Sequence, residues 1–295
     1  MNNVSERPQT APPALAQREP ERRRRVSWSR VVGHVILMTG GFLMVLPFIW
    51  MVLTSFKPSE EIVTNAPKVL PQEPTLSNYA SLPDAAPFVQ FFINSVTISG
   101  ISTIFVAFSC AAAGYALAKY QFRFLNIAFI LILSTILIPL ETYIIPLYLM
   151  MNRFNWVNTY QGIIFPFIIM SSGIFFLRQN ILAIPDDLID AARLDGASEF
   201  AIFLHVILPL SIAPIAAISI INWVYTWSMF IWPLIIASRT EMFTMEIGLM
   251  YFQRQFSVDY GGIMAACVIT MLPVLIVFIA FRTRIIEGVA TSGLK

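Results

Sequence analysis

Charged side chains are scarce in this sequence: they make up 12% of its 295 residues, whereas hydrophobic residues make up 57%. A soluble globular domain carries about twice that charged fraction, ~25%. Cysteine and histidine are rarer still, with two residues of each. Cys110 and Cys267 both fall in apolar runs, where a thiol packs as a small apolar side chain, so we expect neither a structural disulfide nor a metal site. The composition excludes an ordinary soluble domain and indicates a membrane protein.

Short catalytic and phosphate-binding motifs are also missing. The sequence has no GxxxxGK[ST] phosphate loop and none of the GxSxG, HExxH or CxxC patterns of common hydrolase, metalloprotease and redox sites. His205, at the edge of an apolar run, fits an interfacial polar residue better than a proton relay. We therefore predict that the chain is not an enzyme and binds no cofactor, metal or nucleic acid itself.

Six long stretches contain no Asp, Glu, Lys or Arg. Most exceed the ~20 residues that a helix needs to cross a bilayer, and the third, the shortest, still lies within the allowed range. Pro139, Glu141 and Pro146 are expected to interrupt the helix where this third stretch ends. We predict an all-α polytopic membrane protein with six transmembrane helices, over residues 31–56, 85–118, 124–140, 154–177, 200–238 and 260–281.

Lysine and arginine are distributed unevenly between the segments that join these stretches. With the N-terminus inside, the inner segments hold fourteen of the nineteen Lys and Arg residues and the outer segments hold five. Because cytoplasmic loops carry the excess of positive charge, we predict a protein of the cytoplasmic (inner) membrane with both termini cytoplasmic. Residues 1–29, rich in Pro, Arg and Glu, are expected to form a disordered cytoplasmic tail, and residues 30–295 a six-span transmembrane domain.

One polar passage, residues 184–210, interrupts the apolar C-terminal two-thirds of the chain. Pro185 can open a helix, and Asp186 and Asp187 place negative charge where a helix N-terminus favours it. Gly196 then offers the left-handed conformation with which helices commonly end. We predict a short helix, a glycine bend and a second short helix, lying on the membrane surface and presenting one face to another protein.

The same passage resembles the cytoplasmic EAA loop of ABC-importer membrane subunits. Its pattern is matched by Asp190-Ala191-Ala192, Asp195-Gly196-Ala197, Phe203 and Leu208-Pro209. Six further stretches are similar, in order, to the sugar-importer branch that includes the second permease subunit of the maltose importer: SFKPSEEI, TLSNY, FFINS, GYALAKYQF, IPLETYIIPLY and WSMFIWPLI. The resemblance covers about residues 31–295. Two positions depart from it, since Asp190 replaces the motif's glutamate and Ser228 replaces an asparagine found in many relatives.

The resemblance implies the type I permease fold of ABC importers, with a coupling helix in the loop at about 184–204 seated on a separate ATPase. The implied partners are a second homologous permease subunit, a dimer of ATPase subunits that binds ATP and Mg²⁺, an extracytoplasmic solute-binding protein, membrane lipid and a sugar or sugar-like solute. The C-terminal residues 291–295 are similar to a tail that reaches the ATPase dimer, with a frayed end as the alternative.

Small and acidic residues dominate the part of the loop that the resemblance assigns to the ATPase. Small side chains allow close approach, and aspartates accept hydrogen bonds from a partner. An ordinary amphipathic interfacial helix is the alternative, which the acidic charge and the narrow apolar face disfavour. The residues implied to couple to the ATPase are Asp187, Asp190, Ala191, Ala192, Asp195, Gly196, Ala197 and Phe203.

Polar and aromatic residues within the spans are candidates for a solute path, because aromatic faces and amide or hydroxyl groups suit sugars. Glu141 lies either in a water-filled cavity beside the prolines or near the outer interface. Aromatic residues near a span end also form interfacial belts, which is the role expected for Trp232, while that of Trp227 stays open. The candidates are Asn94, Glu141, Asn222, Tyr225, Trp227 and Ser228.

An ion-gradient-driven secondary transporter is the alternative function. Such a protein uses ionisable relays within its spans and is commonly built from repeated halves. A single acid, Glu141, at the end of the third predicted span and the lack of a visible internal repeat argue against it. We therefore predict the membrane-spanning permease subunit of an ATP-driven importer for a sugar or sugar-like solute.

Overall fold

The computed structural model describes residues 28–63, 68–255 and 259–293, and within those residues it contains helices and no strands. The predicted all-α class is confirmed. The chain divides into two compact units, residues 1–47 and 48–295, and the second unit contains all of the helices after α1.

The helices differ widely in length. The longest are α1 (Trp28–Ser55), α5 (Phe88–Lys119), α13 (Ile212–Trp227) and α16 (Tyr260–Gly293). Those of intermediate length are α6 (Arg123–Ser134), α7 (Leu140–Arg153), α9 (Ser171–Leu182), α10 (Asp186–Leu194) and α15 (Met245–Gln255). The short elements are α2 (Ser59–Ile62), α3 (Ser77–Ala80), α4 (Leu82–Ala85), η1 (Thr135–Leu137), α8 (Tyr160–Ile164), η2 (Phe165–Phe167), α11 (Glu199–Ile202), η3 (Phe203–Ile207), α12 (Leu208–Leu210), α14 (Ile231–Ile236) and η4 (Thr240–Met242).

Three helical stretches are each long and apolar enough to cross a bilayer: Val32–Ser55 within α1, the whole of α5, and Tyr260–Phe281 within α16. Three more pairs of segments pass the same test together but are bent between their halves. The bends are 104° between η1 and α7, 46° between η2 and α9, and 79° between α12 and α13. By length and composition the described residues hold three such spans, or six if each bent pair is one span, as predicted.

Proline explains the first bend. Pro139 is the N-cap of α7, and because it has no backbone N–H and restricts the residue before it, the helix from α6 cannot continue through it. This predicted break is confirmed. Pro146 instead lies inside α7, so the predicted interruption there is wrong. The bend at Ser211 was also not expected, and it divides the predicted uninterrupted stretch 200–238.

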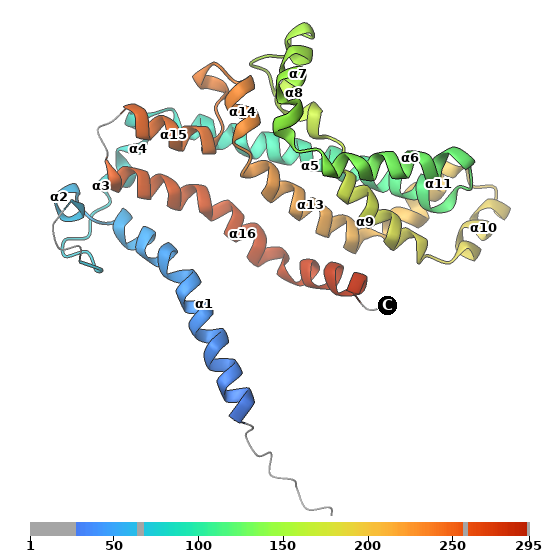
Figure 1. Ribbon diagram of the computed structural model, residues 1–295, viewed down its shortest axis with the longest axis horizontal. Coiled ribbons are helices and arrows are strands. Elements are labelled where there is room, and N and C mark those ends of the chain that lie inside the picture. Colours follow the sequence, from blue (N-terminus) through green and yellow to red (C-terminus); the bar gives the residue numbers. More distant parts are fainter. Residues whose placement is uncertain (1–27, 64–67, 256–258, 294–295) are drawn as a thin grey trace, which may run out of the picture. The chain divides into compact units, whose positions relative to one another are not determined.

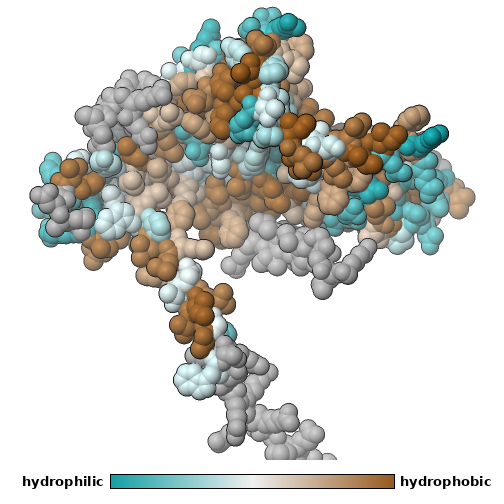
Figure 2. Space-filling view, viewed as in Figure 1, coloured by the Kyte–Doolittle hydropathy of each residue, from teal (hydrophilic) through white to brown (hydrophobic). Residues whose placement is uncertain are grey.

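Helix α5 lies at the centre of the second unit and packs along its length against α9 and α13. It supplies buried residues to all three hydrophobic clusters, among them Phe91, Ile98 and Val106, each 0–2% exposed. Figure 1 shows α5 extending between the end that carries α15 and the end that carries α10 and α11. In Figure 2, hydrophilic residues gather at the α10 end, and hydrophobic residues dominate much of the surface along the helices.

Two tryptophans near the outer ends of the predicted spans are core residues. Trp232 is 0% exposed and its indole Nε1 donates to the carbonyl of Gly162 at 3.1 Å. Trp227 is 1% exposed, donates to the carbonyl of Thr270 at 3.1 Å and stacks on Trp223. A buried indole needs a partner for its N–H, and both have one. The interfacial belt predicted for Trp232 is therefore wrong.

Candidate functional site

The polar passage folds as predicted at its start. Helix α10 begins after Pro185, and Asp186 and Asp187 occupy its first turn while Arg193 occupies its last. Acidic residues at the N-terminus and basic residues at the C-terminus interact favourably with the helix macrodipole. Each stabilises an exposed helix by ~0.3–1 kcal/mol. These charges stabilise a helix of nine residues that would be marginal in isolation.

Gly196 ends α10 in the left-handed conformation, with φ 83°. The backbone N–H of Gly196 donates to the carbonyl of Arg193, and that of Ala197 donates to the carbonyl of Ala192, both at 3.0 Å. These two bonds form a Schellman motif, which satisfies carbonyls that a helix end otherwise leaves unpaired. The predicted glycine bend is confirmed.

Substitutions at Gly196 test whether backbone strain, and not steric clash of a side chain, is what requires glycine at this position. Nothing lies within 4 Å of the position that a Cβ would occupy, so only the backbone conformation opposes a side chain. We expect Gly196→Ala to weaken the loop by ~1–2 kcal/mol, whereas Gly196→Asn costs less because asparagine tolerates this region. Chemical denaturation of the purified protein, or the uptake rate of the assembled transporter, ranks the two variants; equal effects would contradict this explanation.

One side of α10 packs on its own chain and the other is open. Ile189, 2% exposed, joins the hydrophobic cluster of α5 and α9, and Ala192 packs against the same cluster. We call the exposed residues on the other side the α10 face. This face combines acidic side chains with two well-exposed leucines, Leu188 at 46% and Leu194 at 89%. Its members are Asp187, Leu188, Asp190, Ala191, Leu194 and Asp195.

Lys119, the last residue of α5, holds the beginning of α10. Its side chain is 5% exposed, and its ammonium donates to the carbonyl of Ile184 at 2.6 Å and to the carboxylate of Asp186 at 2.7 Å. A buried ammonium is tolerated only where such partners compensate it. The start of α10 is thus tied directly to α5.

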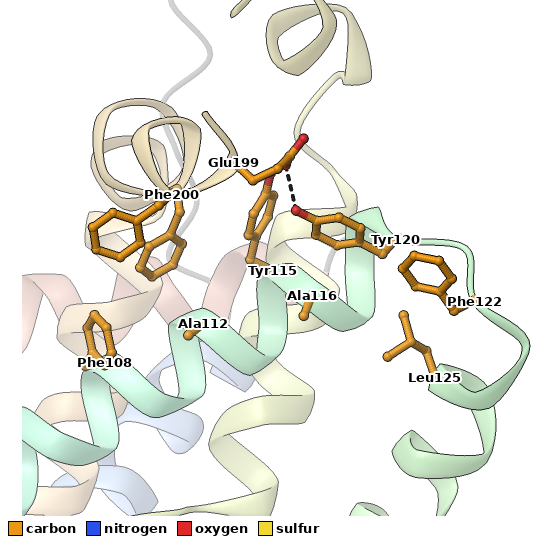
Figure 3. A pocket seen from close by; sticks show the side chains of 10 residues that line it. Phe108, Ala112, Tyr115, Ala116, Tyr120, Phe122, Leu125, Glu199 and Phe200 are labelled. Atoms are coloured by element: carbon orange, nitrogen blue, oxygen red, sulfur yellow. Dashed lines mark hydrogen bonds between the residues drawn. The ribbon is translucent and has the colours of Figure 1, made fainter. Parts of the chain in front are cut away.

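Glu199, at the start of α11, is a second and larger junction that the sequence did not reveal. Its carboxylate accepts hydrogen bonds from the hydroxyls of Tyr120 at 2.6 Å and Tyr115 at 3.0 Å, and from Arg193 Nε at 2.8 Å. Figure 3 shows the Tyr120 hydroxyl directed at this carboxylate. The one available signal was local: Ser198 caps α11, and an acid directly after a cap suits a helix start.

The Glu199 carboxyl stays ionised over the physiological pH range. Hydrogen bonds from Arg193 and then Tyr120 lower its pKa to about 2. A lowered carboxyl pKa stabilises the fold fully above the usual value near ~4.3, and the contribution is lost only as the pH falls toward 2. The side chain is 45% exposed, so solvent screens these interactions. The Glu199 carboxylate therefore serves a structural role and does not act as a proton switch.

A pocket of about 460 Å³ lies beside this junction. Aromatic rings line most of it, and the Glu199 carboxylate is its single charged group among the described lining residues (Figure 3). Phe203, which also lines it, is 5% exposed and packs edge-on to Phe108 and stacked on Tyr115. Phe203 was implied to contact the ATPase; the structure instead places it inside the chain, where it supports the loop.

A second cavity, of about 760 Å³, lies where the bent spans meet. Hydroxyl and amide groups from four elements, η1, α7, α9 and α13, line it, and the hydroxyls of Thr135 and Ser171 hydrogen-bond to each other at 2.7 Å. None of its described lining residues is charged. The first backbone N–H groups of α9, at Ser171 and Ser172, have no partner within the helix. Its polar lining residues are Thr135, Tyr143, Ser171, Ser172, Asn222 and Tyr225.

Residues 22–290, most of the chain, match the family model described as "Binding-protein-dependent transport system inner membrane component". The chain belongs to this family. It is a membrane transport protein, the permease of an ABC import system, and the predicted family is confirmed.

The permease is similar to the arabinooligosaccharides transport system permease protein AraQ of Halalkalibacterium halodurans, with 34% identity over 273 residues, 92% of this chain and 97% of that protein. It is 28% identical over 268 residues to the diacetylchitobiose uptake system permease protein NgcG of Streptomyces coelicolor, covering 90% and 88% of the two chains. Its fold matches a bacterial ABC transporter involved in the import of the acidic polysaccharide alginate, with a TM-score of 0.80, 19% identity, and 88% and 98% coverage. The predicted permease fold is confirmed.

The permease brings only part of the predicted solute path together. Asn222, 3% exposed, and Tyr225, 54% exposed, both line the larger cavity. Asn94 and Trp227 are instead buried with their polar groups hydrogen-bonded inside the protein. Glu141 and Ser228 are exposed and do not line the cavity.

Proposed function

We propose that this permease imports a neutral oligosaccharide or similar polyhydroxylated solute, driven by a separate ATPase that docks on the α10 face. One observation carries the coupling proposal: an exposed acidic helix is fastened to the transmembrane bundle at both ends, by Lys119 and by Glu199. Such a helix moves with the bundle. Because the sequence has no phosphate loop, ATP that drives the import would have to be bound and hydrolysed by a partner.

The remaining partners follow from the family. A binding-protein-dependent system includes an external solute-binding protein, and the permeases of sugar importers pair with a second, homologous permease. The excess of Lys and Arg in the segments predicted to be cytoplasmic supports a cytoplasmic position for α10 and for both termini. In the proposed cycle, ATP closes the ATPase dimer, the α10 faces of both permeases move with it, and the spans turn outward-open; hydrolysis resets them. ATP and Mg²⁺ bind the ATPase and not this chain.

The C-terminal residues 291–295 are proposed to reach toward the ATPase dimer. Helix α16 continues to Gly293, well beyond its membrane-length part, which ends at Phe281. Residues 294 and 295 lie outside the described part of the chain.

The solute is proposed to be a sugar because named relatives transport arabinooligosaccharides and diacetylchitobiose. The larger cavity supports this assignment. Its volume lies within the ~300–1,000 Å³ typical of small-molecule sites, and hydroxyl, amide and backbone N–H groups suit a solute rich in hydroxyls. An uncharged lining suits a neutral sugar better than an acidic one.

Purification of the tagged permease from its native membrane tests the assembly. We expect a second permease and an ABC ATPase to co-purify in stoichiometric amounts, and we expect solute-loaded binding protein to stimulate ATP hydrolysis by the complex. A permease that purifies alone and still transports solute would contradict the proposal.

Tyr225 tests the cavity as part of the solute path. Tyr225→Phe removes one hydroxyl from an exposed ring, so folding should be unaffected. Loss of one hydrogen bond of ~0.5–1.5 kcal/mol should raise the half-saturation concentration for solute by about twofold to about twelvefold. Ile221→Ala, on the same helix and outside the cavity, is the matched control. Uptake of labelled arabinotriose and diacetylchitobiose measures the effect, and an unchanged half-saturation concentration would remove Tyr225 from the path.

A further inference from the structure

Helix α5 is held by polar side-chain contacts near both of its ends. It has 32 residues, which corresponds to a length of ~48 Å, enough to cross the membrane and reach both surfaces. Between the ends it packs against α9 and α13, largely through apolar and small side chains. A straight helix with both ends fastened transmits a displacement from one end to the other.

The C-terminal end of α5 contacts the α10 loop. Tyr115 on α5 and Tyr120 just after it both donate to the Glu199 carboxylate, which also accepts from Arg193 of α10. One side chain therefore joins α5, α10 and α11. Lys119 adds its two bonds to the start of α10. The loop cannot shift without moving this end of α5 or breaking charge-assisted hydrogen bonds.

The opposite end meets the segment between η4 and α15. Asn94 is 0% exposed, and its Nδ2 donates to the carbonyls of Glu241 and Phe243, both at 2.8 Å. Its Oδ1 accepts from the Tyr160 hydroxyl at 2.6 Å and from Gln90 Nε2 at 2.8 Å. All four hydrogen-bonding positions of this amide are used. Asn94 therefore connects α5 to the segment that precedes α15 and is not a solute ligand.

Ser95, the next residue, repeats the connection. Its Oγ, in a side chain 2% exposed, accepts the backbone N–H of Met245 at 2.8 Å. Residues 241–245 are thus fixed to α5 by three hydrogen bonds from two adjacent side chains. This segment leads into α15, which also packs against α5.

We propose that α5 carries the displacement of the α10 loop to the segment 241–245, and that Glu199 is the positioning residue that fastens the loop to α5. The proposal rests on the proposed function, in which the ATPase acts on the α10 face. The segment 241–245 lies on the side opposite α10, where a solute-binding protein would deliver its solute. Glu199 then determines how much of the ATPase movement reaches that side.

The test uses the complete transporter in proteoliposomes with a bimane fluorophore at Glu241→Cys, whose side chain is exposed. Cys110 and Cys267 are first replaced by alanine. Three quantities are measured: the fluorescence change on adding ATP, the ATPase rate, and the solute molecules imported per ATP hydrolysed. We expect ATP to change the fluorescence in the otherwise unaltered protein.

In Glu199→Gln we expect the fluorescence change and the solute imported per ATP each to fall about tenfold, while the ATPase rate stays within about twofold, because the nearly isosteric amide loses the charge-assisted bonds. Tyr120→Phe removes a single donor and should give a smaller loss in the same direction. Ile104→Ala, 70% exposed on α5, is the matched control and should change none of the three. A loss confined to transport per ATP is not produced by simple unfolding.

The outcomes for Glu199→Gln distinguish failure of the inference from failure of the proposed function. An unaltered fluorescence change in Glu199→Gln overturns the inference and leaves the proposed function intact. A parallel fall of ATPase and uptake also overturns it, since Glu199 would then serve docking alone. If Glu199→Gln does not fold, Tyr120→Phe gives the same readout. If ATP changed neither the fluorescence nor the import of solute in the parent protein, both the inference and the proposed function would be overturned.

Discussion

Reversing the charge at Asp195 is expected to abolish solute uptake while the permease still folds and inserts. Asp195 caps α10 through its backbone, whose N–H donates to the carbonyl of Ala191, and its side chain is exposed. Within the described residues its carboxylate makes no ion pair, unlike that of Asp190, which pairs with Arg193 at 3.1 Å. Asp195→Lys therefore breaks no ion pair within the described part of the chain, and its effect reports on a partner.

The size of this effect follows from the burial of a charge at an interface. Breaking a charged contact on one side costs ~2–5 kcal/mol, which weakens docking by about 30-fold to several thousand-fold. Co-purification of the ATPase and uptake in proteoliposomes measure the loss. Asp195→Asn keeps the shape and should give an intermediate loss. Normal uptake by Asp195→Lys would show that the α10 face does not carry the coupling.

Gly162→Ala is expected to prevent the accumulation of folded permease. A Cβ at this position would lie 2.1 Å from the backbone carbonyl oxygen of Trp156, so the backbone itself would have to move. The same glycine accepts the indole N–H of Trp232, which is completely buried. The displacement would disturb the turn into α8 and the cluster around Trp232 together. We expect a cost above ~3 kcal/mol, the upper range for an overpacked core.

A matched control is available on α5. Gly100 has nothing within 4 Å of its Cβ position, so Gly100→Ala should fold normally and gain up to ~1 kcal/mol of helix propensity. Size-exclusion chromatography of detergent-solubilised protein separates the two outcomes. A folded and monodisperse Gly162→Ala variant would show that the close approach of Trp156 is not required.

Local signals in the sequence predicted the elements that local physics controls. The ends of α5 differ from the predicted ends by three residues and one residue, because a long uncharged run permits little but a helix in a membrane. Pro139 and Gly196 act through their own backbones, so their effects were visible without a structure. Pro146 was misjudged because a proline can sit inside a helix when its surroundings accommodate it.

The features that were missed depend on residues far apart in the chain. Glu199 gains its role from Tyr115 and Tyr120, 84 and 79 positions away. Trp232 looks like an interfacial residue until the carbonyl of Gly162, 70 positions earlier, accepts its indole N–H. Asn94 likewise appeared free to bind a solute, although it clamps a segment almost 150 positions later. Composition cannot distinguish these roles, since only tertiary contacts do.

In the proposed cycle, a partner ATPase drives transport by acting on the α10 face. Uptake of labelled arabinotriose into proteoliposomes that contain the complete transporter tests it most directly, with ATP supplied on the ATPase side and a protonophore present. Coupling to the ATPase predicts uptake that requires hydrolysable ATP and is unaffected by collapse of the proton gradient. Uptake that continues without ATP and stops when the gradient collapses would contradict it.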